Sequence, residues 1–405
     1  MQSRRVMLPE GVQDLLIDDC IYRRHIEDTL MENFIKSGYM EVSSPTLEYY
    51  DLFSKDYLAS NGDKMFKLID TNGSILVLRP DCTVPIVRMI STKMKDFIYP
   101  LKLCYVENVF RIDEEQAGKK REFRQAGVEL FGVASYRADA EVIITAIESL
   151  KHLGLENFQI DIGQIKLLKG ILEPMKIAEE EKNSIVYHME NKNFIALDRL
   201  IEELPIEESI QTILKELPRL FGEPREVLEQ VKNLPLTITM IEAIEELEKV
   251  WKMIEGYGLG KYISLDLGMV TTLKYYSGVI FKGFTRDLGV VLLSGGRYDR
   301  LLEDFDIECP ATGFAFVVNK ITKALKIQEN LSVQKKKHIL LLEEGKGRTT
   351  AAVIEALRKQ GYIVEVSLLK NTKDLIEYVQ RRNIDQVMKI DEKGNVEIIE
   401  DLGGL

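Results

Sequence analysis

Residues 109–132 read VFRIDEEQAGKKREFRQAGVELFG, two apolar runs separated by a charged loop that contains a glycine. This pattern predicts two β-strands joined by a loop. Side chains alternate along a strand, so we expect Gln125, Gly127 and Glu129 to share one face of the second strand, with apolar residues on the other face. The sequence therefore predicts the polar floor of a cleft here, although a solvated strand face would produce the same pattern.

The composition is that of an ordinary globular protein. The chain has 405 residues, of which 45% are hydrophobic and 29% are charged, and this length predicts two or three domains. The formal net charge of −11 provides no overall positive field that would draw the chain to nucleic acid or to an anionic membrane. A local basic patch remains compatible with that charge.

Cysteine usage and the first residues indicate the compartment. The four cysteines show neither a CxxC pair nor the spacing of metal ligands, which predicts reduced thiols, a cytoplasmic location and no metal site. They are Cys20, Cys82, Cys104 and Cys309. Residues 1–16 lack the apolar segment of a signal peptide, and the chain has no run of about 18 apolar residues. We therefore expect a protein that is neither secreted nor membrane-spanning.

The first part of the chain predicts helices mixed with antiparallel strands. Apolar residues recur at helical spacing in residues 18–37, and Gly38 follows as a stop signal. The next residues are expected to be extended up to Pro45, and the Asn72-Gly73 pair between two apolar runs predicts a hairpin. Further elements are expected as helices over 82–91 and 138–154 and a strand over 157–163.

Three further segments suggest the domain organisation. Residues 164–256 are rich in Glu and Lys with helical periodicity and no clear strand, which predicts a helical insertion. Strands are expected over 262–270, 275–284 and 288–296, followed by a helix that includes residues 313–325. We predict a core domain over 1–326, a linker over 327–337 and a small α/β domain with a largely parallel sheet over 338–405.

Other polar residues stand at places where a ligand could bind. Asp81 and Thr83 lie at the entry to the helix of residues 82–91, where a carboxylate also stabilises the helix by capping. Adjacent tyrosines occur at 275 and 276, and a Gly-Gly pair that would let a backbone approach a ligand precedes Tyr298. Taken singly, each could equally be a core or turn residue.

Taken together and in order, these motifs resemble the catalytic core of class II histidyl-tRNA synthetases. They are more similar still to a paralogous family, the regulatory subunits of short-form ATP phosphoribosyltransferase. The resemblance covers about the first 325 residues apart from the helical insertion. It rests on LPEGVQDLL, SSPTLEYYDLF, LRPDCTVPIVR, the 109–132 stretch, ADAEVI, YYSGVIFKGF and GGRYD. It implies an α+β fold: an antiparallel sheet flanked by helices, with a shortened form of the anticodon-binding domain at residues 338–405.

The resemblance also implies a histidine pocket. Asp81, Thr83 and Gln125 would meet the ammonium group, and Arg111 the carboxylate. Glu129 and Tyr276 would meet the two imidazole nitrogens. Neighbouring walls would be provided by Tyr275 and Tyr298, and residual phosphate binding by Arg111 and Arg121.

Departures from the synthetase pattern imply that amino-acid activation is lost. Residues 271–274 read TTLK where synthetases carry R-G-L-D, so the activating arginine is absent. Val317 and Lys320 replace the motif 3 glycine and arginine, and lysine cannot stack as a planar guanidinium does. No acidic pair precedes a Thr-Gly-rich loop, so phosphoribosyl transfer by this chain alone is not expected either.

The resulting prediction is a non-catalytic regulatory subunit without a cofactor. The resemblance implies a short-form ATP phosphoribosyltransferase catalytic subunit as partner, L-histidine as feedback inhibitor, and a homodimer formed around Pro45 within a hetero-octamer, with no tRNA. Two alternatives remain at this stage. One is an active histidyl-tRNA synthetase, and the other is a stand-alone amino-acid sensor or amide-forming synthetase paralogue.

Overall fold

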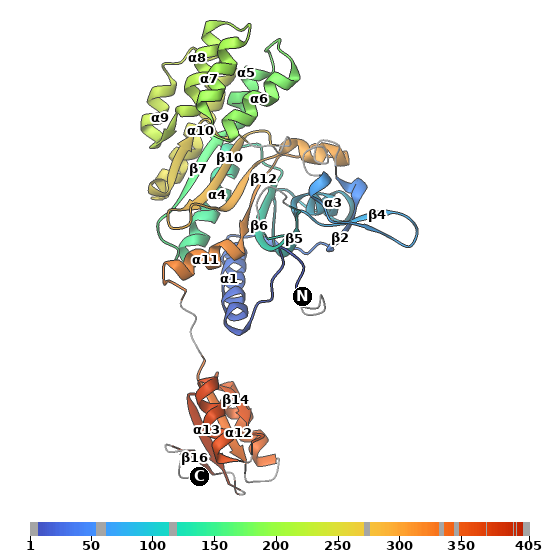
Figure 1. The fold of residues 1–405 in the computed structure, drawn as a ribbon, viewed down its shortest axis with the longest axis vertical. Helices are drawn as coiled ribbons and strands as arrows, with labels where there is room; N and C mark the ends of the chain where they lie inside the picture. Colours follow the sequence, from blue (N-terminus) through green and yellow to red (C-terminus); the bar gives the residue numbers. More distant parts are fainter. Residues whose placement is uncertain are drawn as a thin grey trace. The chain divides into compact units, whose positions relative to one another are not determined.

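The computed structural model describes residues 7–53, 62–112, 120–270, 276–331, 336–343, 348–369, 371–391, 393 and 395–399. The chain divides into two compact units, Met1–Leu331 and Ser332–Leu405. Figure 1 shows the elements of both units along the chain.

A nine-stranded sheet organises the first unit, in the order β1-β5-β6-β12-β11-β10-β7-β9-β8. Neighbouring strands are antiparallel except for the parallel pairs β1–β5 and β7–β9. The predicted antiparallel sheet is thus confirmed. The strands span Met40–Glu41 (β1), Leu101–Phe110 (β5), Glu122–Phe131 (β6), Phe158–Gln164 (β7), Phe221–Gly222 (β8), Ile263–Asp266 (β9), Val279–Thr285 (β10), Val291–Arg297 (β11) and Ala311–Val317 (β12).

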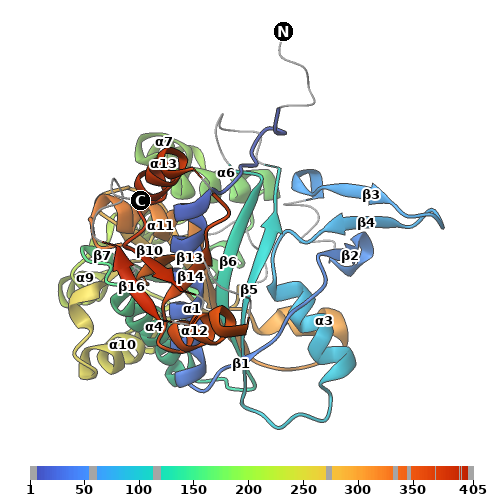
Figure 2. The ribbon, with the colours of Figure 1, turned by 90° about the horizontal axis from the view of Figure 1, so that it is seen from below.

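Helices cover the two faces of this sheet differently. On one face, α1 (Ile17–Lys36), α4 (Tyr136–His152) and α11 (Val318–Ile327) share the largest apolar core, in which the ring of Phe34 stacks on Phe316. On the other face, α3 (Thr83–Lys93) and the 3₁₀ segment η6 (Asp299–Phe305) pack over β5 and leave most of β6 open. Figure 2 shows α1 and α4 on one side of β5 and β6, and α3 on the other.

Local signals in the N-terminal half are confirmed. Helix α1 ends at Lys36, and Gly38 adopts a left-handed φ of 85° that a residue with a Cβ rarely takes. The hairpin joins β3 (Lys67–Ile69) to β4 (Ile75–Leu78), with Gly73 at φ 87° in its turn. Strand β2 (Leu47–Tyr49) completes a three-stranded sheet, flanked by the short 3₁₀ segments η2 (Tyr50–Leu52) and η3 (Gly62–Lys64).

A block of helices follows β7 and lies beside β7 and β10 (Figure 1). It comprises α5 (Ile165–Leu172), α6 (Glu179–Glu190), α7 (Phe194–Glu203), α8 (Glu208–Glu216), η4 (Leu217–Arg219), α9 (Pro224–Val231) and α10 (Ile238–Gly256), with η5 (Gly260–Tyr262) after it. The prediction of no strand in this stretch is wrong in one place. The two residues of β8 pair with β9 at the edge of the large sheet, a pairing too short to leave a periodic signal.

The prediction of a helix over residues 313–325 is also wrong for the first five of these residues. Residues 311–317 form β12, which pairs with β6 on one side and β11 on the other, and the helix begins only at Val318. Phe314 and Phe316 are both buried, so the apolar run reads as helix or strand from the sequence alone. Residues 311–317 form a strand because their backbone pairs with β6 on one side and with β11 on the other.

The second unit is a small α/β domain, as predicted. Its sheet order is β14-β13-β15-β16, in which β13 pairs in parallel with both β14 and β15. Its antiparallel edge strand, β16, was not expected from the sequence. The elements are β13 (His338–Glu343), α12 (Arg348–Lys359), β14 (Ile363–Val366), α13 (Thr372–Arg382), β15 (Gln386–Ile390) and β16 (Val396–Ile399).

Candidate ligand-binding site

A cavity of about 690 Å³ lies over the open face of β6, β11 and β12. Of the eight residues predicted to bind histidine, seven line this cavity: Asp81, Thr83, Arg111, Gln125, Glu129, Tyr276 and Tyr298. The eighth, Tyr275, lies outside the described residues. Tertiary structure thus brings together residues that lie up to 217 positions apart in sequence, as between Asp81 and Tyr298.

Glu129 forms the deepest polar point of the cavity. Its side chain is only 2% exposed, and it accepts hydrogen bonds from the hydroxyl of Thr83 (2.7 Å) and from that of Tyr298. Burial raises the pKa of Glu129 to about 8, although the two hydrogen bonds oppose that rise. A glycine, Gly313, faces it on β12, since a Cβ there would overlap the Glu129 carboxylate.

Gln125 lies four residues before Glu129 on β6, about 13 Å away along the strand. The side chain is 7% exposed, and among the described residues its carbonyl oxygen has no hydrogen-bond donor. A buried acceptor without a donor is costly, so a ligand that brings an N–H or O–H group to this oxygen would be stabilised.

Asp81 caps a helix and also lies in the cavity lining. Its Oδ1 accepts the backbone N–H of Val84 (3.1 Å) in the first turn of α3, which confirms the expected capping. The side chain also lines the cavity. The start of α3 therefore holds a carboxylate at the cavity edge, with Thr83 directed to Glu129 from the same turn.

The arginines near the cavity have different roles. Arg111 lines it, donates from Nε to the carbonyl of Pro80 (2.6 Å) and lies over the ring of Phe123. Arg121 is absent from the lining and pairs with Glu10 (3.4 Å). Of the two arginines proposed for residual phosphate binding, the structure thus places only Arg111 at the cavity.

Tyr105 is a lining residue that sequence reasoning missed. It lies opposite Gly127 in the β5–β6 register, and a Cβ on Gly127 would stand 2.6 Å from the Tyr105 hydroxyl. Gly127 therefore makes room for the Tyr105 ring, which in turn forms part of the cavity floor. The alternation of Leu101, Leu103 and Tyr105 in β5 is the signal that would have placed it on this face.

Three lysines also line the cavity. They are Lys120, Lys320 and Lys323, and burial lowers the pKa of Lys120. Lys320, at the position of the synthetase motif 3 arginine, donates to the backbone carbonyl of Val291 (3.0 Å). Val317 is the last residue of β12 and lies opposite Gln125. Residues 271–274 lie outside the described residues.

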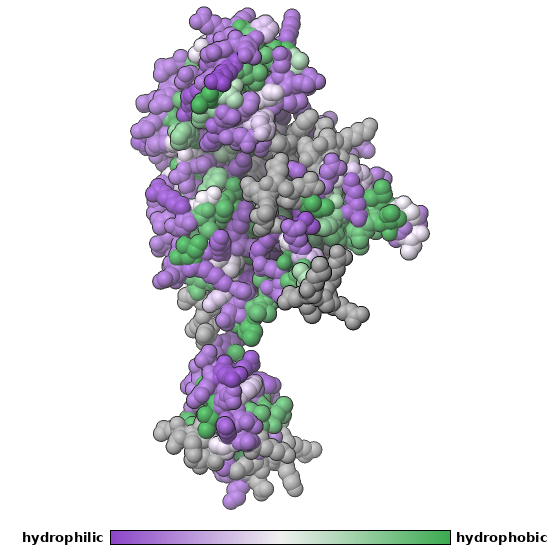
Figure 3. All heavy atoms as spheres, in the orientation of Figure 1, coloured by the Kyte–Doolittle hydropathy of each residue, from purple (hydrophilic) through white to green (hydrophobic). Residues whose placement is uncertain are grey.

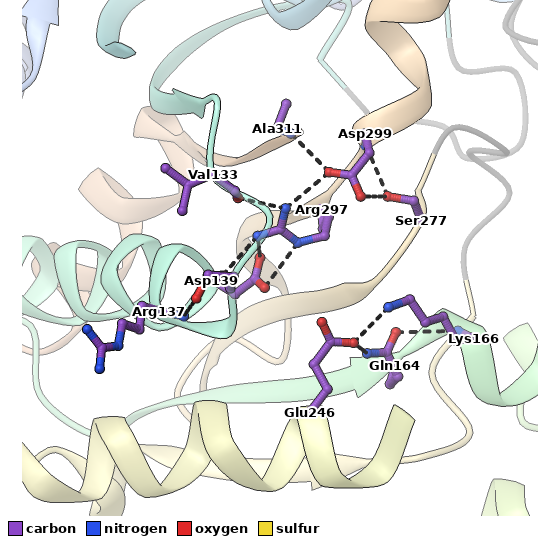
Figure 4. A network of polar contacts seen from close by, with 11 residues as sticks. Val133, Arg137, Asp139, Gln164, Lys166, Glu246, Ser277, Arg297, Asp299 and Ala311 are labelled. Atoms are coloured by element: carbon purple, nitrogen blue, oxygen red, sulfur yellow. Dashed lines mark hydrogen bonds and ion pairs between the residues drawn. The ribbon is translucent and has the colours of Figure 1, made fainter. Parts of the chain in front are cut away.

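A buried arginine fixes the strand end that carries Tyr298. Arg297 is 3% exposed and makes two contacts with Asp139 at the start of α4, at 3.0 and 3.1 Å. It also pairs with Asp299 (3.1 Å), whose other oxygen accepts from the hydroxyl of Ser277 (2.9 Å). Figure 4 shows Arg297 between these two carboxylates. The network therefore ties α4, the end of β11 and the segment before β10 together around the cavity wall.

Comparisons with known proteins identify the family. A sequence model of the family described as histidyl-tRNA synthetase matches residues 11–321. The ATP phosphoribosyltransferase regulatory subunit of Alkaliphilus metalliredigens (strain QYMF) is 55% identical over 399 residues, covering 97% of this chain and 100% of the relative. The chain belongs to the ATP phosphoribosyltransferase regulatory subunits, within the histidyl-tRNA synthetase family. The regulatory subunit of Acetivibrio thermocellus is 42% identical, covering 98% of this chain and 96% of that relative.

Solved structures show the same fold for the regulatory subunit family. An ATP phosphoribosyltransferase regulatory subunit/histidyl-tRNA synthetase from Bacillus halodurans superposes with a TM-score of 0.83 at 29% identity, covering 96% of this chain and 99% of that one. Histidyl-tRNA synthetase from Nostoc sp. PCC 7120 reaches 0.79 at 19% identity, covering 97% and 96%, and shows the fold alone. The predicted class II synthetase-like fold is thereby confirmed.

The described residues contain neither a membrane-spanning helix nor a cluster of metal-ligating side chains. None of the helices in the described ranges is long and apolar enough to cross a membrane. The same residues contain no group of three or more His, Cys, Asp or Glu side chains that could hold a metal ion. The cysteines are unpaired thiols, three of them buried.

Proposed function

We propose that this chain is a non-catalytic subunit that binds L-histidine in the cavity over β6. By that binding it would regulate the catalytic subunit of short-form ATP phosphoribosyltransferase at the first step of histidine biosynthesis, in the cytoplasm. The partner is supported by the relatives, which are named as regulatory subunits of that transferase. The ligand is supported by the cavity.

One observation carries the ligand assignment: a single cavity holds a buried carboxyl group, an unsatisfied amide oxygen and an arginine. An imidazole N–H can donate to Glu129, which two hydroxyl groups already orient. An ammonium group can donate to the free oxygen of Gln125, and a carboxylate can meet Arg111. The apolar and aromatic lining supplies the remaining contact area.

The absence of catalysis is part of the proposal. Thr271 stands where synthetases carry the activating arginine of R-G-L-D, and a neutral hydroxyl cannot stabilise the charge that develops during adenylation. Lys320 is engaged with a backbone carbonyl at the position of the motif 3 arginine. Loss of one such contact typically costs about 10²–10³ in rate, so loss of both leaves binding without activation.

We further propose a homodimer through the region around Pro45 within a hetero-octamer that includes the catalytic chains. The β3–β4 hairpin beside this region projects from the sheet, and apolar side chains gather over it (Figures 2 and 3). Ile69 is 83% exposed there, and Leu68 and Ile75 are exposed as well. Burying such a patch against a second chain would be favourable. Histidine would then favour the inhibited assembly, with a coupling of typically about 1–3 kcal/mol.

The test combines two measurements on one preparation of the full chain. Calorimetric titration records histidine binding, and ATP–pyrophosphate exchange records histidine activation. We expect binding without exchange. ATP–pyrophosphate exchange at the rate of a synthetase would instead establish the alternative, an active histidyl-tRNA synthetase. The match to the histidyl-tRNA synthetase family model is the observation that favours this alternative. No binding and no exchange would refute both.

A reconstituted complex with the short catalytic chain tests the role of the cavity. Glu129→Ala is expected to abolish inhibition by histidine while the complex still assembles, because Glu129 is buried in the cavity and offers almost no exposed surface to a partner chain. Glu122→Ala is the matched control on the same strand, outside the cavity, and should keep inhibition. Unchanged inhibition in Glu129→Ala would remove this cavity from the mechanism.

A further inference from the structure

One charged side chain of the helical block reaches the cavity wall. Lys169, on the first helix of the block, α5, donates from Nζ to the backbone carbonyl of Tyr276 at 2.8 Å. Tyr276 lines the cavity. The two residues are 107 positions apart in sequence, and Lys169 itself does not line the cavity, so any effect on a ligand must act through Tyr276.

The segment from Tyr276 to Gly278 is held from two sides. On the sheet side, the N–H of Ser277 donates to the carbonyl of Arg297 (2.8 Å), and the Ser277 hydroxyl donates to Asp299 (2.9 Å). On the helical side, the N–H of Ile165 donates to the carbonyl of Gly278 (3.1 Å). The Tyr276 carbonyl and the Ser277 N–H belong to one planar peptide unit, so Lys169 and Arg297 hold this unit from its two sides.

The chemistry of the Lys169 contact makes it stronger than a surface contact. Burial lowers the pKa of Lys169, the neighbouring Arg300 lowers it further, and Glu173 opposes both. An ammonium group that has lost part of its water gains more from a carbonyl acceptor than a solvated one does. Removing it would leave a half-buried peptide carbonyl without its charged donor.

We propose that Lys169 is a positioning residue of the cavity, which holds the Tyr276 side chain in place and joins the cavity wall to the helical block. This inference rests on the proposed binding of histidine. Helix α5 packs on α10, and α10 packs on α4, whose first turn holds Arg297 through Asp139. A ligand that presses on Tyr276 therefore acts on the helical block through the Lys169 hydrogen bond, next to the Ile165–Gly278 bond, and on α4 through the Arg297 network.

The experiment uses the full chain and three variants. Lys169→Met removes the donor and keeps most of the side-chain volume, while Lys169→Arg keeps a charged donor. Lys166→Met is the matched control, because Lys166 lies one turn earlier on α5 and pairs with Glu246 (2.8 Å), as Figure 4 shows, and not with the Tyr276 carbonyl. Thermal unfolding of each variant confirms that it is folded.

Histidine affinity is the first readout. We expect Lys169→Met to weaken binding about tenfold, since one charge-assisted hydrogen bond is lost, and Lys169→Arg and Lys166→Met to stay within about twofold of the parent. In a Tyr276→Ala background, Lys169→Met should cause no further loss, because a residue that acts through Tyr276 is not additive with it. Equal affinity of the parent and Lys169→Met, or full additivity with Tyr276→Ala, overturns the proposal.

Amide hydrogen exchange separates this inference from the proposed function. Without any ligand, Lys169→Met should speed exchange of the Ser277 amide by about tenfold, because the segment loses one anchor. If the parent chain fails to bind histidine, the proposed function fails, yet faster exchange would still establish Lys169 as the anchor of Tyr276. Unchanged exchange in Lys169→Met overturns the inference, whatever the parent chain binds.

Discussion

Replacing Glu129 with glutamine should make the stability of the ligand-free protein less dependent on pH. Glutamine has nearly the same shape and can still accept a hydrogen bond from Thr83 or Tyr298, but it cannot ionise. The perturbation therefore removes one titrating group from a site that is almost closed to water.

The sign follows from the direction of the shift. Burial raises the pKa of Glu129 from 4.5 to about 8 in the folded protein, so between these values the folded state holds a proton that the unfolded state has released. Stability from this group is then lost as the pH rises. Each pH unit in that window costs about 1.4 kcal/mol, and the step from pH 5.5 to 7.5 costs about 2–3 kcal/mol.

Urea unfolding followed by tryptophan fluorescence measures this difference. Trp251 is the one tryptophan of the chain and is buried in α10, so its emission reports on the unit Met1–Leu331. Between pH 5.5 and 7.5, the free energy of unfolding of the parent protein should fall by about 2–3 kcal/mol more than that of Glu129→Gln. Glu122→Gln, on the same strand but outside the cavity, should behave like the parent. An equal loss in the parent and in Glu129→Gln would refute the reasoning.

Three further substitutions test the packing around the cavity. Gly127→Ala places a Cβ 2.5 Å from a backbone carbonyl oxygen of β12 and should lower the free energy of unfolding by about 1–3 kcal/mol. An unchanged urea midpoint of unfolding would contradict this close approach. Gly313→Ala displaces the Glu129 carboxylate and should abolish histidine binding measured by calorimetry, whereas unaltered binding would exclude that carboxylate as a contact. Arg297→Met leaves Asp139 buried without its cation and should cost about 3–5 kcal/mol in unfolding free energy; a loss below about 1 kcal/mol would show that the pair contributes little.

Part of the site could be predicted because strand geometry is local. The alternation in residues 122–131 places Gln125 and Glu129 on one face, and the structure places both in the cavity. The Asn72-Gly73 turn and the start of α3 at Thr83 could be predicted for the same reason, since each depends on a few neighbouring residues. Local backbone preference was sufficient in these places.

Other parts depend on contacts between distant residues. The apolar run of residues 313–317 is compatible with a helix or a strand, and only pairing with β6 and β11 makes it a strand. The need for a glycine at 127 depends on Tyr105, which lies opposite it, and neither strand alone specifies the register between β5 and β6.

The sequence by itself determined the ordered set of motifs that indicates the family, the order of most helices and strands, and which face of β6 is polar. The tertiary structure alone decided that a carboxyl group with a pKa of about 8 lies at the cavity floor, that Arg121 points away, and that Lys169 holds Tyr276 across 107 positions. Burial is the physical reason. Desolvation, close approach and long-range hydrogen bonds arise only when separate elements pack together, and no single segment of the chain specifies them.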